Sequence, residues 1–531
     1  MMNGNEAQTF ITNFVGRADP LWTAISLANW NLATTGDGRY KDEKIQLQLA
    51  EHRLYEIPAD WETVQRLYEN RDKYEPELRR EVEVLYRYFL TNQSTPAENE
   101  ALARLEAEIQ QIYTTHRGSV GGRSVSDNEI SEILRHSTNE AERRQAWLGS
   151  KEVGARVADL IRQVGRLRNQ IAQRLGFRDH YHFALVRQEI DEKALFDLFG
   201  RLAALTDAPF KQVKAEVDGR LAIRLGRDGA TLAAWHYADP FFQQSPPVFD
   251  ANLDAFFTDK DLASLSVQAY RRMGMEVEDI LGRSDLYERP GKNQHAFCTR
   301  IGRTGDTRIL CNLRPNTRWA TTQLHELGHA VYNKYLPQSL PYLLRTPAHT
   351  NSTEAIAMLM GRLTHDAGWL IEVAGANASA VQATAGEVRR ELAANMLIFV
   401  RWVLVMLHFE QAFYADPERL DLHSLWWDLV EKYQGVPRPA GRDAPDWAAK
   451  YHVALAPVYY HNYVLGELTA SQLEHWLNQA AGRPGINPDT GPLLIERFFA
   501  HGARYPWDRL VEVATGEPLR PDYFVAQFVT E

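Results

Sequence analysis

The sequence predicts a mainly α-helical protein with one small β-hairpin, and three observations lead to this fold class. Apolar residues recur at the three- and four-residue spacing of amphipathic helices through most of the 531 residues. Only residues 294–313 alternate with a period of two, as two short apolar stretches about Gly302 and Gly305. The length of 531 residues suggests two to four domains, but large helical enzymes often form one two-lobed body, and no internal repeat or low-complexity linker is present, so we expect one domain over 1–531.

The helices can be placed in order between their breakers. Ser126 and Glu129 have the spacing of a capping box, directly after a loop predicted at Gly121 and Gly122. The predicted helical stretches are one through Trp22 and Trp30, then 40–56, 59–91, 97–116, one entered at Ser126, 139–176, 191–226, 259–274, 385–415 and 423–434. The unbroken stretch at 139–176 is long enough to brace a whole lobe.

Composition excludes several classes of function. The net charge is -10, with Asp+Glu 69 against Lys+Arg 59, and this balance argues against a nucleic-acid partner. Two cysteines, Cys298 and Cys311, are too few for a disulfide scaffold and are expected to be reduced. The N-terminus lacks the pattern of a signal peptide, and the longest apolar run, 396–407, is interrupted by Arg401. We therefore expect a buried core helix there, no membrane partner and a cytoplasmic location.

The stretch from His325 to Glu354 carries the clearest chemistry. It begins HELGH, which places His325 and His329 one helical turn apart on one face, with Glu326 beside them. A second helical pattern opens at Glu354 and would bring a carboxylate back as a third metal ligand. The fourth position would remain for water. The alternative interpretation is a buried helix with two hydrogen-bonded histidines.

Two further segments are candidates for substrate binding. The 450–467 segment, KYHVALAPVYYHNYVLGE, is dense in hydroxyl and imidazole donors that could face a developing oxyanion, although an aromatic stripe of this kind also suits a core. The hairpin at 294–313 could offer a strand edge to an extended peptide, or could simply pack against the core.

Several segments together resemble peptidase family M2, the angiotensin-converting enzyme family, and more distantly the M3 oligopeptidases. The resemblance covers nearly the whole chain, and His295-Ala296 also matches the substrate-edge strand of that family. The segments that carry it are ANWNLATT at 28–35, HELGH with Glu354, WWDLVEKYQG at 426–435, AKYH at 449–452 and GARYPWDRL at 502–510.

The resemblance implies a two-lobed helical ellipsoid with a deep central channel and a zinc ion on its floor. Residues 1–120 would form lid-like helices at the mouth, and 290–470 would form the catalytic core. The residues that match the family's functional positions are His325, His329 and Glu354 as zinc ligands, Glu326 as general base, His452 and Tyr463 as donors to the scissile carbonyl, Lys450 and Tyr460 as carboxylate-binding groups, and His295 with Ala296 at the substrate.

The sequence also departs from the family pattern. The family's third carboxylate-binding group is a glutamine after a tryptophan, and the nearest match is 235–237, WHY, so that contact is expected to be lost. Met358 replaces an acidic residue that would orient a zinc histidine. One extra residue follows His452, which leaves open whether Tyr459 or Tyr460 faces the carboxylate.

Two other departures concern a disulfide and an anion. The family's disulfide partners align with Gln294 and Asn312, so no bridge is expected. Arginines that hold chloride in animal members align with Asn462 and Val430, so no chloride activation is expected.

The sequence thus predicts a zinc peptidase that acts on short peptides and releases C-terminal dipeptides. An oligoendopeptidase with the same chemistry, and a catalytically silent zinc- or peptide-binding relative, are the alternatives. The intact set of ligands and base argues against the silent relative. The oligomeric state stays open.

Overall fold

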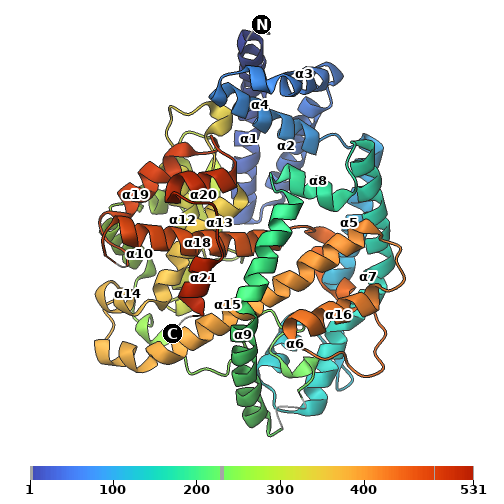
Figure 1. The fold of residues 1–531 in the computed structure, drawn as a ribbon, viewed down its shortest axis with the longest axis vertical. Coiled ribbons are helices and arrows are strands. Elements are labelled where there is room, and N and C mark those ends of the chain that lie inside the picture. The colour runs from blue at the N-terminus through green and yellow to red at the C-terminus, as the bar shows by residue number, and fades with distance from the viewer. Residues whose placement is uncertain (1–3, 228–231, 484, 530–531) are drawn as a thin grey trace. The chain divides into compact units, whose positions relative to one another are not determined.

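The computed structural model describes residues 4–227, 232–483 and 485–529. Within these residues the chain forms helices and two small antiparallel sheets, so the mainly α fold with a small hairpin is confirmed (Figure 1). Its contacts divide it into two compact units. Helices α15 (Ala378–Ala415), α18 (His461–Ala480) and α21 (Asp522–Phe528) each contribute residues to both units.

The first unit comprises Met1–Gln93, Asn252–Ala385 and Leu465–Tyr523. It holds the antiparallel pair β3 (Phe297–Ile301) and β4 (Asp306–Leu310). Its helices are α1 (Gly4–Thr35), α2 (Gly38–Tyr55), α3 (Pro58–Glu69), α4 (Pro76–Thr91), α10 (Leu262–Arg272), α11 (Glu278–Arg283), α12 (Thr317–Lys334), α13 (Thr350–Gly361), α14 (Ala367–Glu372), α19 (Thr490–Arg497) and α20 (Trp507–Thr515).

The second unit comprises Ser94–Ala251, Gly386–Val464 and Phe524–Glu531. It holds the antiparallel pair β1 (Gly118–Val120) and β2 (Arg123–Val125). Its helices are α5 (Pro96–Thr115), α6 (Asp127–His136), α7 (Glu140–Arg174), α8 (His180–Arg187), α9 (Glu192–Leu225), α16 (Leu422–Gln434) and α17 (Tyr451–Leu455).

The N-terminal helices α1 to α4 pack around an aromatic core. Phe14, Tyr55 and Phe89 are buried, with ring centres of Phe14 and Phe89 5.2 Å apart. The single helix predicted over 59–91 is wrong: the chain breaks into α3, a short 3₁₀ turn and α4. Pro76 explains the break, because proline has no N–H to donate and suits the first turn of a new helix.

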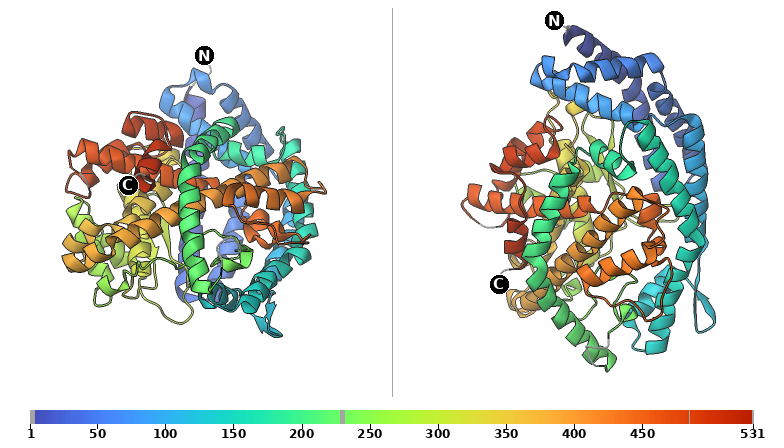
Figure 2. Two further views of the ribbon diagram at one scale, coloured as in Figure 1. Left: turned by 60° about the horizontal axis from the view of Figure 1, so that its bottom comes forward. Right: turned by 45° about the vertical axis from the view of Figure 1, so that its right-hand side comes forward.

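Local capping signals set several boundaries of the second unit. Ser126 and Glu129 form the predicted capping box: the Glu129 N–H donates to the Ser126 hydroxyl, and the Ser126 N–H donates to the Glu129 carboxylate. The Asn139 side chain caps α7, which runs beside α5 (Figure 2). The hairpin β1–β2 was not predicted. Its strands have three residues each, too few to display a period of two, and the predicted loop at Gly121 and Gly122 is its turn.

The predicted hairpin at 294–313 is confirmed as β3 and β4, joined by a turn in which Gly302 and Gly305 adopt positive φ. Cys298 and Cys311 are free thiols, as expected. The hairpin contacts α12, and α12 packs side by side with α13 (Figure 1).

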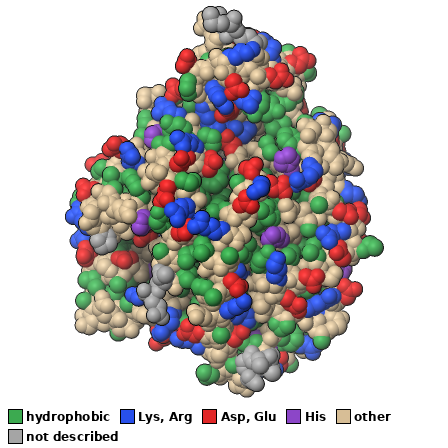
Figure 3. All heavy atoms as spheres, viewed as in Figure 1, with side chains coloured by type: hydrophobic (Ala, Val, Ile, Leu, Met, Phe, Trp, Pro, Cys, Tyr) green, Lys and Arg blue, Asp and Glu red, His purple; other side chains and the backbone are tan. Residues whose placement is uncertain are grey.

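Helix α15 contains the longest apolar run. By length and composition it could cross a membrane, but 67% of its most apolar window is buried. Arg401, which interrupts the run, is itself buried and donates to the Thr206 hydroxyl (2.8 Å) and the Ala203 carbonyl (3.2 Å) of α9. The apolar run therefore lies against α9, and the guanidinium of Arg401 forms hydrogen bonds there. On the face shown in Figure 3, acidic and basic side chains are interspersed.

Candidate active site

The HELGH sequence lies in the second half of α12. The Asn316 side chain caps this helix by accepting from the Trp319 N–H at 2.9 Å. The imidazoles of His325 and His329 project one turn apart, with ring centres 4.9 Å apart and ring planes at 88°. Helix α13, which carries Glu354, begins at Thr350, one turn earlier than the sequence pattern indicated.

The first unit brings His325, His329 and Glu354 together. One donor atom from each side chain lies within 4.8 Å of the others. The Nε2 atoms of His325 and His329 lie 3.6 Å and 3.9 Å from the Glu354 Oε2. Ligand bonds of about 2.0–2.1 Å in a tetrahedral zinc site place the donor atoms about 3.4 Å apart. Two imidazoles and one carboxylate at this separation fit Zn²⁺.

The protonation states of these groups also suit a cation. Burial lowers the pKa of His325 to about 4 and that of His329 to about 3, so both imidazoles are neutral, which is their ligand form. Burial, with repulsion from Glu467, raises the pKa of Glu354 to about 7. A divalent cation between these groups would offset the carboxylate's desolvation and favour its ionised form.

The side chain of Glu326 projects from α12 towards strand β3. The side chain is buried, and its pKa rises to about 8 through burial and the nearby Glu354 carboxylate, while a hydrogen bond from the Cys298 backbone lowers it. Strand β3 therefore passes directly beside this carboxylate. A carboxylate whose pKa is raised toward neutrality can accept and release a proton near pH 7.

Neighbouring side chains hold the residues of the candidate metal triad in place. The His329 Nδ1 lies 2.8 Å from the Thr353 hydroxyl, which leaves Nε2 facing Glu354. Helix α18 approaches α13 closely at Gly466, where an added Cβ would lie 3.2 Å from the Glu354 Cβ and 3.2 Å from the Met358 sulfur. Met358 thus fills the contact between these helices. Sequence reasoning missed Thr353, which has no motif of its own.

The second unit collects the donors predicted from 450–467. The His452 and Tyr460 rings lie 4.7 Å apart, and those of Tyr460 and Tyr463 lie 5.8 Å apart. The Lys450 ammonium lies 5.5 Å from the Tyr460 ring centre. Burial, with the Lys450 charge, lowers the pKa of His452 to about 3, so this imidazole is neutral. All four side chains therefore form one cluster.

Gln243 completes this cluster. Its Oε1 accepts from the Lys450 ammonium at 2.7 Å and from the Tyr460 hydroxyl at 3.2 Å. The expectation that the cluster lacks a glutamine is therefore wrong. The nearest sequence match, at 235–237, lies elsewhere: His236 is buried and bonded to Glu140 at 2.7 Å. The signal for Gln243 is a glutamine after an aromatic residue, Phe242, and not after a tryptophan.

A strained turn presents Gln243. Phe242 adopts a φ of 51°, a conformation that is uncommon for a residue other than glycine. The Gln434 side chain, at the end of the WWDLVEKYQG segment, donates to the Phe241 carbonyl (3.0 Å) and the Phe242 carbonyl (2.8 Å). Asp239 accepts the Gln243 N–H at 2.9 Å. Gln434 of that segment thus helps to hold the turn in place.

A second strained turn lies between His452 and Tyr460. Val458 adopts a φ of 54°, and its N–H donates to the buried Glu410 carboxylate at 2.9 Å. Tyr460 then shares Gln243 with Lys450, and the Tyr459 ring packs on Tyr463 at 5.3 Å. The choice left open by the sequence therefore falls on Tyr460 as the partner of Lys450.

His295 and Ala296 directly precede β3 in the first unit. His295 is exposed, and its N–H donates to the Asn293 side chain at 2.9 Å. The two residues lie at the start of the strand that passes Glu326.

Comparison with known proteins identifies the family of the chain. The model of Peptidase family M3 matches residues 133–530, and the model named Angiotensin-converting enzyme matches residues 1–217. Angiotensin-converting enzyme of Bos taurus is 22% identical over 97% of the chain and 42% of its own length. The enzyme of Theromyzon tessulatum is 22% identical over 78% of the chain and 73% of its own length.

The chain thus spans about two fifths of the length of the Bos taurus relative. Angiotensin-converting enzyme-like protein Ace3 of Mus musculus is 32% identical over 17% of the chain and 14% of its own length. Both families with matching models are zinc-dependent, and a possible metal-binding triad is present here. The chain therefore belongs to Peptidase family M3, and its first 217 residues also match the model named Angiotensin-converting enzyme.

Proposed function

We propose that the protein is a zinc peptidase that releases C-terminal dipeptides from short peptides. The observation that carries this proposal is the cluster of Lys450, Tyr460 and Gln243. An ammonium, a phenol and an amide can together bind a carboxylate through one charge and several hydrogen bonds. A cluster of this kind would make a free C-terminal carboxylate part of what the enzyme recognises.

His325, His329 and Glu354 would hold the zinc ion. Bound zinc supplies Lewis acidity and lowers the pKa of a bound water toward about 7. Glu326 takes the proton from the attacking water and later returns it to the leaving amine. Its buried position beside β3 keeps this carboxylate close to a peptide that pairs with the strand.

His452 and Tyr463 would donate hydrogen bonds to the carbonyl oxygen as it gains negative charge. The low pKa of His452 means that its imidazole is neutral and carries one N–H. Its buried Nδ1 has no hydrogen-bond partner among the described residues, so neither Nδ1 nor Nε2 is fixed as the donor by a protein neighbour.

An oligoendopeptidase is the second candidate. The match of the M3 model over residues 133–530 favours it, because that model covers more of the chain than the angiotensin-converting enzyme model does. Such an enzyme would use the same metal ligands and base but would not require a free C-terminus.

One experiment separates the two candidates. A hexapeptide with a free C-terminus, and the same hexapeptide with an amidated C-terminus, are incubated with the zinc-loaded protein, and the fragments are identified by mass spectrometry. Release of the last two residues from the acid form, with slower cleavage of the amide, supports the proposal. Equal cleavage of both forms at an internal bond supports the oligoendopeptidase. An intact hexapeptide, with zinc bound, would indicate a silent relative.

A further inference from the structure

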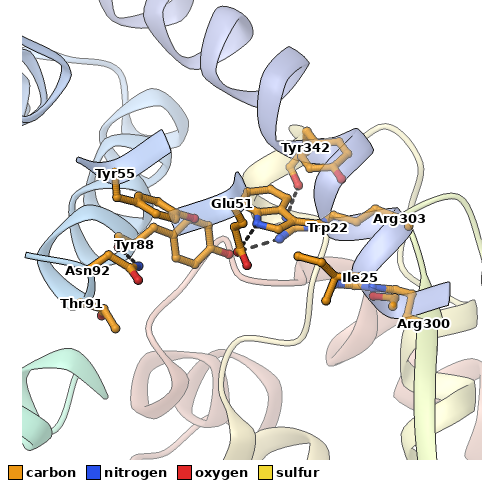
Figure 4. A pocket seen from close by; sticks show the side chains of 12 residues that line it. Trp22, Ile25, Glu51, Tyr55, Tyr88, Thr91, Asn92, Arg300, Arg303 and Tyr342 are labelled. Carbon is orange, nitrogen blue, oxygen red and sulfur yellow. Dashed lines mark hydrogen bonds between the residues drawn. The ribbon is translucent and has the colours of Figure 1, made fainter. Parts of the chain in front are cut away.

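A polar cavity lies in the first unit, between the N-terminal helices and the β3–β4 hairpin. It has a volume of about 420 Å³. Its walls carry Trp22, Glu51, Tyr88, Arg300, Arg303 and Tyr342 among other residues, and Figure 4 shows the two arginines together on the hairpin side. None of these residues belongs to the metal triad, and the proposed mechanism leaves the cavity without a role.

The two arginines are unusual because no carboxylate neutralises them. Among the residues that the structure describes, neither guanidinium lies within 4 Å of an Asp or Glu oxygen, and the same holds for Arg345 nearby. The acid beside the turn of the same hairpin, Asp306, is already paired with Arg308 at 2.7 Å. Burial and the charge of Arg303 together lower the pKa of Arg300 to about 10, so this guanidinium is poorly compensated.

The two arginines have different duties. Arg303 is the more engaged of the two: its two terminal nitrogens donate to the Tyr342 and Leu343 carbonyls and to the Tyr88 hydroxyl, and it lies over the Tyr342 ring at 4.7 Å. Arg300 donates to the Arg345 carbonyl at 3.0 Å and makes two long contacts of 3.4 Å and 3.5 Å. Its Nε–H has no acceptor among the described side chains. Arg300 therefore keeps donors for a ligand, while Arg303 adds positive charge.

Arg300 lies close to the candidate catalytic carboxylate. It is two residues beyond Cys298 on β3, and the Cys298 backbone bonds to Glu326. Two residues of an extended strand span about 6.6 Å, and their side chains point to the same face. On the other side, Arg300 contacts Asn333, whose amide donates to the His329 carbonyl. The guanidinium is thus within a few peptide residues of the bond that Glu326 would act on.

We propose that Arg300, supported by Arg303, forms a subsite for an acidic side chain of the substrate, on the N-terminal side of the cleaved bond. This inference rests on the proposed function. The proposed function already assigns the C-terminal dipeptide to Lys450, Tyr460 and Gln243, so we assign the part of the substrate that extends along β3 to Arg300 to the residues before the cleaved bond. A carboxylate there would make charge-assisted hydrogen bonds with a planar guanidinium.

The helical wall of the cavity carries the carboxylate of Glu51. Its carboxylate accepts the Trp22 indole N–H at 2.7 Å on the helical wall, and it forms no ion pair with either arginine. An acidic side chain would therefore enter on the hairpin side, against Arg300. A basic side chain in the same place would meet two guanidinium groups.

The test compares pairs of peptides in which one residue is either Glu or Gln, so that the two peptides differ in the charge of one side chain. A peptide ending in a fixed dipeptide carries Glu or Gln at the second, third or fourth residue before the cleaved bond, and kcat/KM is measured for each pair. In the native protein we expect the Glu form to be favoured roughly tenfold at one of these positions. The ratio should fall to about one in Arg300→Gln and recover in part in Arg300→Lys.

Arg308→Gln is the matched control, because it removes one charge from the same hairpin without lining the cavity, and its ratio should stay near the native value. Equal rates for Glu and Gln at all three positions would overturn the proposal, as would a Glu preference that survives in Arg300→Gln.

Competition with inorganic phosphate gives a second test of the subsite. Phosphate should compete with the Glu peptide, and equal inhibition of both peptides would indicate a free-anion site instead.

Calorimetric titration of Glu326→Gln with the same peptide pairs separates this inference from the proposed function. Tighter binding of the Glu peptide, lost in the double variant with Arg300→Gln, supports the subsite even when no dipeptide is released. Equal binding of both peptides rejects the subsite, whatever bond the native protein cleaves.

Discussion

At the residue scale, Glu326 and the metal ligands have separable duties. Glu326→Gln removes the base but leaves His325, His329 and Glu354 in place, so we expect about one zinc per chain and little peptide turnover. Glu354→Ala removes a ligand, so zinc should be lost as well. Elemental analysis alongside a peptide assay measures both effects. Native turnover in Glu326→Gln would contradict the role given to this carboxylate.

Tyr463 is expected to act only in the transition state. Tyr463→Phe keeps the ring that packs against Tyr459 and Phe399 but removes the hydroxyl. Loss of one oxyanion donor corresponds to about 2.7–4 kcal/mol, so kcat should fall by about 10²–10³ with little change in KM. Steady-state kinetics on one peptide measures this. A rise in KM alone would make Tyr463 a substrate-binding residue.

Lys450 predicts a pH dependence of substrate affinity. Burial lowers its pKa to about 8, partly offset by the Asp239 charge. The side chain is therefore charged below pH 8 and becomes neutral above it. Since only the charged form attracts a carboxylate, KM for a peptide with a free C-terminus should rise between pH 7 and pH 9.

The amidated peptide is the control for this effect, because its KM should not follow the Lys450 titration. In Lys450→Gln the pH-dependent rise of KM for the free acid should disappear. Parallel KM profiles for the acid and the amide in the native protein would remove Lys450 from the carboxylate site.

At the element scale, the close contact of α12 and α13 is what brings Glu354 to the two histidines. Gly328 permits this contact: an added Cβ would lie 2.6 Å from the Ala357 Cα, which is backbone and cannot swing aside. Gly328→Ala should therefore separate the helices, destabilise the fold by about 1–3 kcal/mol and weaken zinc binding. Thermal unfolding with and without zinc measures both consequences.

Gly200 offers the matched control for this substitution. It lies inside α9, is exposed, and has no atom within 4 Å of an added Cβ. Gly200→Ala should raise stability by about 0.5–1 kcal/mol, because alanine loses less backbone entropy in a helix. An unchanged zinc affinity in Gly328→Ala would show that α12 and α13 can adjust without moving the ligands.

At the scale of the whole molecule, we predict that activity does not depend on chloride. The amide of Asn462 already donates to Gln188 at 2.7 Å. Val430 and Lys151 line one cavity of about 20 Å³, and burial lowers the Lys151 pKa to about 7, which leaves it largely neutral at pH 8. A buried halide without a compensating charge costs several kcal/mol. Activity at pH 8 and fixed ionic strength should be equal in acetate and in chloride.

The control for this comparison is a series in ionic strength with acetate alone, because screening of the -10 net charge depends on ionic strength and not on the anion. A saturable rise with chloride that is absent with acetate would show that Lys151 or another cation holds the ion.

The features that the sequence determined by itself are those set by neighbouring residues. The capping box of Ser126 and Glu129 and the cap at Asn139 follow from local hydrogen bonds, and their helices begin where expected. The histidine pair follows in the same way, because residues i and i+4 share a face of any helix. The sequence also indicated a helix with Glu354 after the prolines, but the approach of this carboxylate to the two histidines depends on the contact between α12 and α13.

The features that only the tertiary structure decided depend on contacts between distant segments. Gln243 lies 207 residues from Lys450 in the sequence, and two turns with residues in positive φ bring Gln243 and Tyr460 to the same ammonium. The sequence likewise does not show that Arg300 lacks a carboxylate partner among the described residues, because any of the many Asp and Glu residues could have paired with it. Helix periodicity reports which face is buried, but it does not report which partner that face meets. That partner is fixed only when the whole chain has packed.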